Sequence, residues 1–224
     1  MTDYTLTRSS RKTIGLYVRN GAVEVRAPLK VPKADIDRFI RSKREWIEKT
    51  LAKSVANAEK RESFTLDYGD AVTYLGEEYP IAARPGDRAG FDGSVFYMPP
   101  ELALWQIKDA CVQIYRLLAK RVLTAKTLEF AKQMGVTPLA VKINGANTRW
   151  GSCSAKRSIN FSWRLIMAGG DVVDYVVVHE LAHITEMNHS PRFWEIVAGV
   201  LPDYKARQTR LKELQARLNA EDWE

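Results

Sequence analysis

Hydrophobic and polar positions along the first hundred residues change period several times, and each change predicts a different element. Three short segments have the composition of strands: residues 4–8, 13–19 and 22–27. Between the last two, Asn20-Gly21 is typical of a tight hairpin turn. Apolar residues at helical spacing then predict one helix over residues 33–60. Short strands separated by glycines follow over residues 63–98.

Pro99-Pro100 suggests a boundary, so we expect a β-rich α+β region over residues 1–100 and a second domain over residues 101–224. The second domain is predicted to open with a helix over about 101–134 that ends at Gly135. A strand near 138–143 and a β-hairpin come next, the hairpin having its arms at 147–153 and 159–165.

The valine-rich stretch after Gly169-Gly170 has the composition of a strand, but its apolar pattern continues through Leu181 and Ile184. This length favours a buried helix. The residues from Asn188 to Pro191 interrupt the apolar pattern. Ser190 followed by Pro191 is typical of the start of a new helix. A last helix is expected from near residue 202.

All three histidines of the chain lie within eleven residues of one another, at positions 179, 183 and 189. His179-Glu180-Leu181-Ala182-His183 matches the H-E-x-x-H pattern of zinc hydrolases. On a helix, residues four apart share a face, so both imidazoles can reach one metal ion. Glu180 is then placed to take a proton from a zinc-bound water molecule. The pattern predicts a site for one divalent ion, zinc, with Glu180 as the catalytic base.

The third ligand is predicted to be His189, because three imidazoles leave a fourth tetrahedral position open for water. Glu186 and Glu195 are rival oxygen ligands, and Cys153 is a further candidate for the fourth position. The spacing of the histidines equals that of the metzincin pattern, but Glu186 stands where that pattern has glycine. Membership of that group is therefore not expected.

Two further residues are candidates for contact with substrate or with a developing oxyanion. Arg149 could bind a carboxylate, a phosphate or an oxyanion, or it could pair with Asp171 or Asp174. Tyr175 precedes His179 by four residues and shares its helix face, where it could line the site or pack in the core.

The order of these motifs resembles the YgjP-like metallopeptidase family. The resemblance rests on Thr148-Arg-Trp-Gly-Ser-Cys153, the H-E-x-x-H run and Asn188-His-Ser190, and it spans nearly the whole chain. It implies a zincin-like catalytic half, built from a metal helix, an antiparallel hairpin and a long packing helix, with three histidine ligands. The same core is similar to SprT-type proteases, which act on DNA-bound proteins. In such folds, an edge strand beside the metal helix pairs with an extended substrate.

Charge is unevenly distributed, since residues 102–170 hold 11 Lys and Arg against 2 Asp and Glu. Part of this excess lies on the predicted long helix, at Lys108, Arg116, Lys120, Arg121, Lys126 and Lys132. A surface of this kind favours anionic partners such as nucleic acid, although many charged helix faces are merely solvated. The chain has no apolar signal core or membrane-length segment, and we expect a soluble, cytoplasmic protein without a membrane partner.

These observations predict a zinc-dependent hydrolase, and in particular a metallopeptidase that acts on peptides or proteins. Two alternatives stay open. One is a metal-dependent phosphohydrolase of nucleotides or related phosphates, because the same zinc-water unit can attack phosphorus. The other is a nucleic-acid-associated protease, for which the basic segment 102–170 would supply the binding surface.

Overall fold

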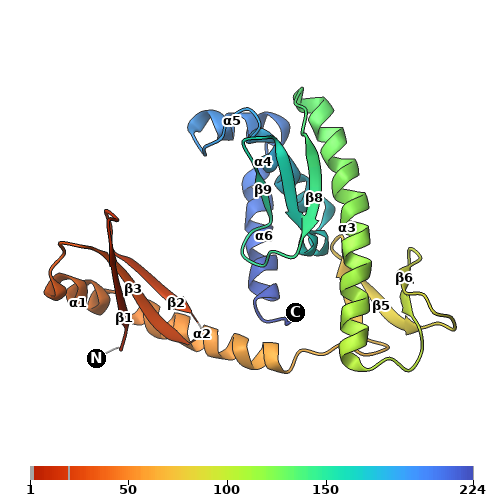
Figure 1. Cartoon of the computed structure of the whole chain (residues 1–224), viewed down its shortest axis with the longest axis horizontal. Coiled ribbons are helices and arrows are strands. Elements are labelled where there is room, and N and C mark those ends of the chain that lie inside the picture. The colour runs from red at the N-terminus through yellow and green to blue at the C-terminus, as the bar shows by residue number, and fades with distance from the viewer. Residues whose placement is uncertain (1–2, 20, 224) are drawn as a thin grey trace. The chain divides into compact units, whose positions relative to one another are not determined.

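The computed structural model describes residues 3–19 and 21–223, which divide into two compact units (Figure 1). The first unit runs to Phe64 and includes Leu218–Asp222, and the second comprises Thr65–Arg217 with Trp223. The division therefore falls after Phe64 rather than at Pro99-Pro100, where we expected it. The strands before residue 100 belong to the second unit because their side chains pack on the long helix that follows.

The first unit is a three-stranded sheet covered by two helices. Its elements are β1 (Thr5–Ser9), β2 (Gly15–Arg19), β3 (Ala22–Pro28), α1 (Lys33–Ser42) and α2 (Arg44–Glu62). The central strand β3 pairs parallel to β1 and antiparallel to β2, which confirms the predicted hairpin although Asn20 lies outside the described residues. The single helix predicted over 33–60 is two helices, because the backbone leaves helical geometry at Lys43.

The second unit begins with a small four-stranded sheet in the order β4-β5-β7-β6. These strands are β4 (Ala71–Tyr74), β5 (Glu77–Ala83), β6 (Gly90–Phe91) and β7 (Phe96–Met98). The long helix α3 (Leu104–Met134) follows and ends at Gly135, whose left-handed φ of 65° confirms the predicted stop. Phe96 packs on Tyr115 of α3 with ring centroids 5.3 Å apart, and this contact joins the sheet to the helix.

A second sheet of this unit has the order β8-β10-β9, which leaves β9 at an edge. Its strands are β8 (Ala140–Asn144), β9 (Gly151–Cys153) and β10 (Ser158–Ser162). The antiparallel pairing of β9 with β10 confirms the predicted hairpin, but both arms are shorter than expected. The second arm ends at Ser162 because the buried residues Trp163–Met167 form a 3₁₀ helix instead.

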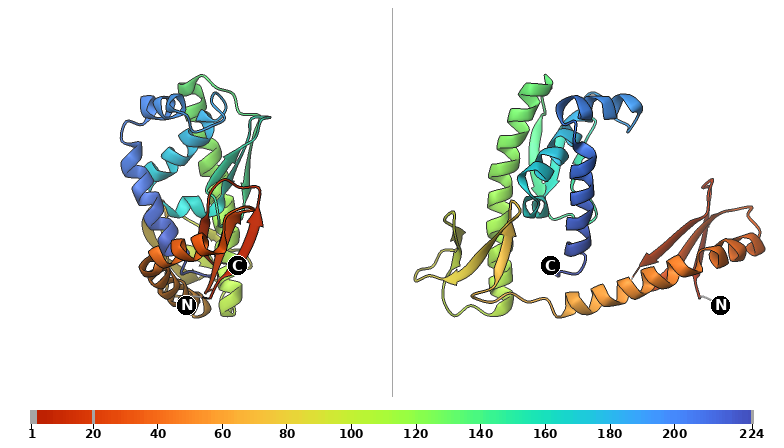
Figure 2. Two further views of the ribbon diagram at one scale, coloured as in Figure 1. Left: turned by 90° about the vertical axis from the view of Figure 1, so that its left-hand side faces the viewer. Right: turned by 180° about the vertical axis from the view of Figure 1, so that it is seen from behind.

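Three helices complete the unit: α4 (Gly170–Ala182), α5 (Pro191–Val200) and α6 (Tyr204–Leu218). The valine-rich segment is therefore a helix, and nine of its residues are buried, as predicted for a core element. Helix α3 runs along α4 and β8 (Figures 1 and 2), and α4 also contacts β9, so the helix that carries the H-E-x-x-H motif packs on both the long helix and the sheet. The mixed α+β class is confirmed.

No helix among the described residues is both long enough and apolar enough to cross a bilayer.

Candidate metal centre

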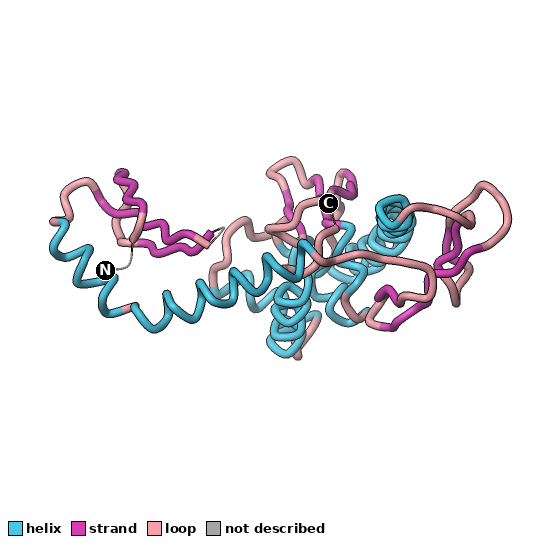
Figure 3. The backbone as a smooth tube through the Cα atoms, turned by 90° about the horizontal axis from the view of Figure 1, so that it is seen from below, coloured by secondary structure: helices cyan, strands magenta, loops and turns pink. Residues whose placement is uncertain are grey.

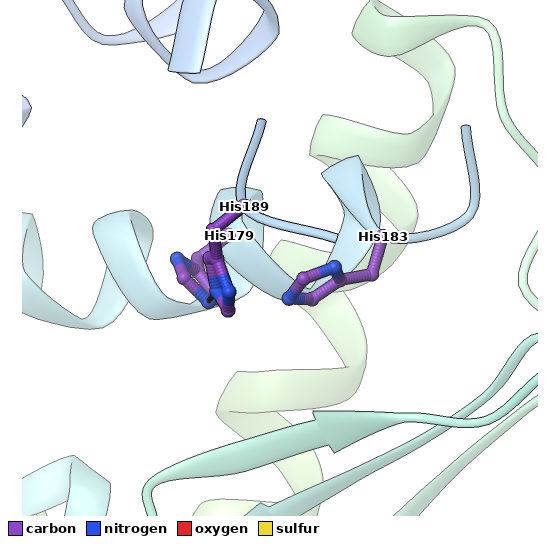
Figure 4. Close-up of side chains that lie close together, drawn as sticks. All are labelled: His179, His183 and His189. Carbon is purple, nitrogen blue, oxygen red and sulfur yellow. Dashed lines mark hydrogen bonds between the residues drawn. The ribbon is translucent and has the colours of Figure 1, made fainter. Parts of the chain in front are cut away.

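Helix α4 and the segment after it bring the three histidines together. His179 and His183 lie at the C-terminal end of α4, and His189 lies in the link to α5 (Figure 4). Each ring contributes one nitrogen atom to a cluster, and these three nitrogen atoms all lie within 4.8 Å of one another. The Nε2 atoms of His179 and His189 are 3.1 Å apart. Two nitrogens bound at 2.0–2.1 Å to one tetrahedral ion lie roughly 3.3 Å apart, so this spacing fits a shared ion.

The ring nitrogen of His183 that faces away from the cluster has the partner expected for a metal ligand, whereas Nδ1 of His179 is buried and has no hydrogen-bond partner among the described residues. His183 Nδ1 lies 3.1 Å from the carbonyl oxygen of Glu186. A carbonyl can only accept, so Nδ1 carries the proton in this bond and the Nε2 lone pair is left for an ion. Burial is the main cause that lowers the pKa of His179 to about 3, and the pKa of His183 is lowered for the same reason. Both rings are therefore neutral, which is the form that binds a metal.

An aromatic cradle, Phe193 with Trp194, holds the three imidazoles. Phe193 is fully buried, and its ring centroid lies 4.9, 4.5 and 4.8 Å from those of His179, His183 and His189. Trp194 stacks on His189 at 5.7 Å. Sequence reasoning missed both residues. The signal that could have found them was the predicted helix start at Ser190-Pro191. This helix start is confirmed, because the Ser190 hydroxyl group accepts a hydrogen bond from the Phe193 amide. The bond fixes the first turn of α5, which carries both aromatic residues.

Glu180 points from α4 toward the edge strand β9. It is 5% exposed, and this burial raises the pKa of its carboxyl group to about 7, an effect that the positive charge of Arg149 opposes. A Cβ atom placed on Gly151 would lie 2.6 Å from both Cγ and Oε1 of Glu180. The missing side chain at Gly151 therefore makes room for the Glu180 carboxylate, a function that sequence reasoning did not assign.

The two candidate contact residues have different environments. Arg149 is exposed just before β9, close enough to affect the Glu180 carboxyl. The carboxylates proposed as its structural partners are engaged elsewhere, since Asp171 pairs with Arg210 and Asp174 pairs with Lys126. Arg149 therefore does not form the ion pair with Asp171 or Asp174 that the sequence left open.

Tyr175 is 3% exposed and packs beside His179, with ring centroids 5.9 Å apart. Its hydroxyl group has a hydrogen bond with Gln208, and its ring stacks on Tyr204. Burial raises the pKa of the Tyr175 hydroxyl. The structure therefore places Tyr175 as a supporting residue behind His179 rather than as an open donor to an oxyanion.

The rival ligands lie outside the cluster. Among the described residues, the set that could hold a metal contains the three histidines and neither Glu186, Glu195 nor Cys153. Cys153 is a free, half-buried thiol, and burial together with the nearby Glu180 raises its pKa. The donor set is therefore all imidazole, which suits zinc and leaves room for a water molecule or a substrate.

Strand β9 presents one edge of its backbone to β10 and the other away from the sheet, beside Glu180. The Trp150 carbonyl accepts from the Ser162 amide, and the Ser154 amide donates to the Ser158 carbonyl. The backbone N–H and C=O groups of successive residues point to opposite edges of an antiparallel strand. Those of residues 150, 152 and 154 therefore face β10, and those of Gly151 and Cys153 face the open edge. This edge can accept an extended chain.

The basic segment is partly used for internal contacts. Lys126 of α3 pairs with Asp174 of α4 and so holds the two helices together. Arg116, Lys120, Arg121 and Lys132 are exposed on α3 beside Leu117, which is 70% exposed. A nucleic-acid contact at this helix stays a prediction.

Comparison with known proteins adds two findings. The family model described as a YgjP-like metallopeptidase domain matches residues 12–214. Among solved structures, the chain is similar to a metallopeptidase zymogen, the abylysin of Pyrococcus abyssi. The two sequences are 19% identical and the TM-score is 0.37, and the match covers 46% of this chain and 98% of the zymogen chain. Among curated proteins, none matches the chain.

Proposed function

The chain belongs to the YgjP-like metallopeptidase family, and on this premise we propose that it is a zinc-dependent peptidase in which Glu180 acts as the general base. Family membership supports a metal-dependent peptidase in general. The observation that favours this mechanism is the convergence of three imidazoles, two of them on the helix that also carries the buried carboxylate of Glu180. A zinc ion held by His179, His183 and His189 would polarise a peptide carbonyl and lower the pKa of a water molecule.

The protein groups have separate tasks in this proposal. The Glu180 carboxylate accepts a proton from the attacking water and passes it to the leaving amine nitrogen. Its contact with Gly151 limits where the Glu180 carboxylate can lie. Arg149 is exposed near that carboxylate, and its proposed role is to bind a substrate carboxylate or a developing oxyanion.

The substrate is proposed to bind as an extended chain along β9. Gly151 and Cys153 would supply main-chain hydrogen bonds, which select for an extended backbone and only weakly for side chains. Arg149 lies two residues before β9, and Gly151, the first residue of this strand, contacts Glu180, so a chain on this edge would lie near the Glu180 carboxylate.

The proposal is tested by replacing Glu180 with Gln, which keeps the size of the side chain and removes its basicity. Casein hydrolysis should fall about 10²–10⁴-fold while the bound zinc is retained. Zinc content by mass spectrometry and unfolding temperature are measured on the same samples. Unchanged turnover would exclude Glu180 as the base.

The same samples decide between peptide and phosphate chemistry. ATP is offered beside casein, because the sequence left a phosphohydrolase open. Release of phosphate that depends on Glu180, with no cleavage of casein, would reject the peptidase proposal. His189→Ala is the matched control for the metal, since it removes a ligand and leaves Glu180 in place.

A further inference from the structure

The sheet of the first unit has one covered and one open face. Alternate residues of β3 point to opposite sides, so Val23, Val25 and Ala27 form the core under α1 and α2. Figure 3 shows these helices following the sheet on one side only. Register places Tyr17 beside Glu24 and Gly15 beside Arg26 on the other face.

Three arginines gather on this open face around one tyrosine. The guanidinium carbon of Arg26 lies 5.0 Å from the centre of the Tyr17 ring, and that of Arg19 lies 5.5 Å from it. Arg11 reaches the same place from the loop before β2. A Cβ atom on Gly15 would lie 2.6 Å from Arg11 Nη2 and 3.0 Å from Tyr17 Cε2, so the glycine leaves space for the guanidinium.

This cluster, Arg11, Tyr17, Arg19 and Arg26, is only partly neutralised. Glu24 pairs with Arg26 at 2.7 Å. Arg11 Nε is buried and has no hydrogen-bond acceptor among the described residues. Like charges brought together repel one another, and cation–π contacts offset this only in part. Among the described residues, Glu24 is therefore the one carboxylate that pairs with this cluster of three guanidinium groups.

We propose that this arginine cluster binds the phosphodiester backbone of nucleic acid. A guanidinium presents a planar fork of N–H donors that matches phosphate oxygens in pairs. Arginine and tyrosine also occur at protein interfaces. Three guanidinium groups gathered around one ring, with one of them paired to a carboxylate, favour a polyanion whose phosphates recur along its chain. The site lies in the unit that lacks the histidines, and it is independent of the proposed peptidase activity.

The experiment measures binding of the full-length protein to a fluorescein-labelled oligothymidylate and to a labelled duplex, by anisotropy over a range of salt concentrations. The test variant is Arg11→Gln/Arg19→Gln/Arg26→Gln. The matched control, Arg38→Gln/Arg41→Gln/Arg44→Gln, removes equal charge from the helices that cover the other face.

The test variant should bind the single strand at least about tenfold more weakly at low salt, and its log–log salt slope should fall by about 2, at roughly 0.7 per lost phosphate contact. The control should stay within about threefold of the parent. Equal weakening in both variants, or no binding by the parent at low salt, would overturn the proposal.

A second variant decides the question if the triple substitution does not fold. Glu24→Gln removes the carboxylate that competes with phosphate for Arg26. It should tighten oligothymidylate binding about threefold at low salt, because one repulsive charge is lost. Unchanged or weaker binding would count against the site.

Discussion

Gly151→Ala is the sharpest test of how the structure positions the proposed base. The added methyl group would lie 2.6 Å from Cγ and Oε1 of Glu180 and 2.8 Å from Cδ. The backbone at Gly151 is not left-handed, so the substitution introduces no strain of its own. Its whole effect should come from the contact with the carboxylate.

The size of the effect follows from this contact. Nonbonded carbon atoms rest at about 3.5–4.0 Å, so the carboxylate must retreat by roughly 1 Å. Glu180 is 5% exposed and has little space into which to move. Misplacement of a catalytic group by about 1 Å can lower the rate about 10²-fold. Overpacking at a tight site costs about 1–3 kcal/mol in the free energy of unfolding.

The assay compares casein turnover, zinc content and urea unfolding in the variant and in a matched control. Gly199→Ala serves as the control because Gly199 lies in helix α5 with nothing within 4 Å of its added Cβ. It should leave turnover unchanged and raise the unfolding free energy by about 0.4–1 kcal/mol. Zinc content should remain at the parent level in both variants, because neither substitution touches an imidazole.

A double variant isolates the contact itself. In the Glu180→Ala background the carboxylate atoms that the added methyl group would strike are gone, so the stability cost of Gly151→Ala should nearly vanish. Parent-like turnover in the single variant, or the same stability cost in both backgrounds, would refute the reasoning.

The remaining predictions concern the metal and the packing around it. Zinc at about a hundred times its Kd should stabilise the protein by about 2.7 kcal/mol, or roughly 5–10 °C in a thermal melt, and His189→Ala should reduce this shift. Phe193→Ala should cost about 3–5 kcal/mol in urea unfolding, because this buried ring packs on all three imidazoles; an effect as small as that of the exposed Leu128→Ala would contradict this. Asp174→Asn should cost about 1.5–3 kcal/mol by weakening the contact with Lys126, whereas the exposed pair formed by Arg38 should contribute little.

Some features of the protein were determined by short stretches of sequence. Helical geometry alone places residues four apart on one face, and so the sequence predicted that His179 and His183 converge. The link that holds His189 was predictable because Ser190 and Pro191, which follow it directly, mark the start of a new helix. Gly135 likewise marks the end of α3 through its own backbone preference. Each of these features depends on covalent spacing and local conformation.

Tertiary structure decided the rest, because it depends on which distant segments pack together. Nothing near Gly151 in the sequence indicates that Glu180, on another element, needs the space of its missing side chain. The sequence shows Phe193 only as an apolar residue, and its role beside the three imidazoles follows from the packing of α5 against α4. The same holds for Arg11, whose place beside Tyr17 follows from the pairing of strands in the first unit. A one-dimensional pattern records which face of an element is apolar, but contacts between elements arise only when those faces are buried against one another.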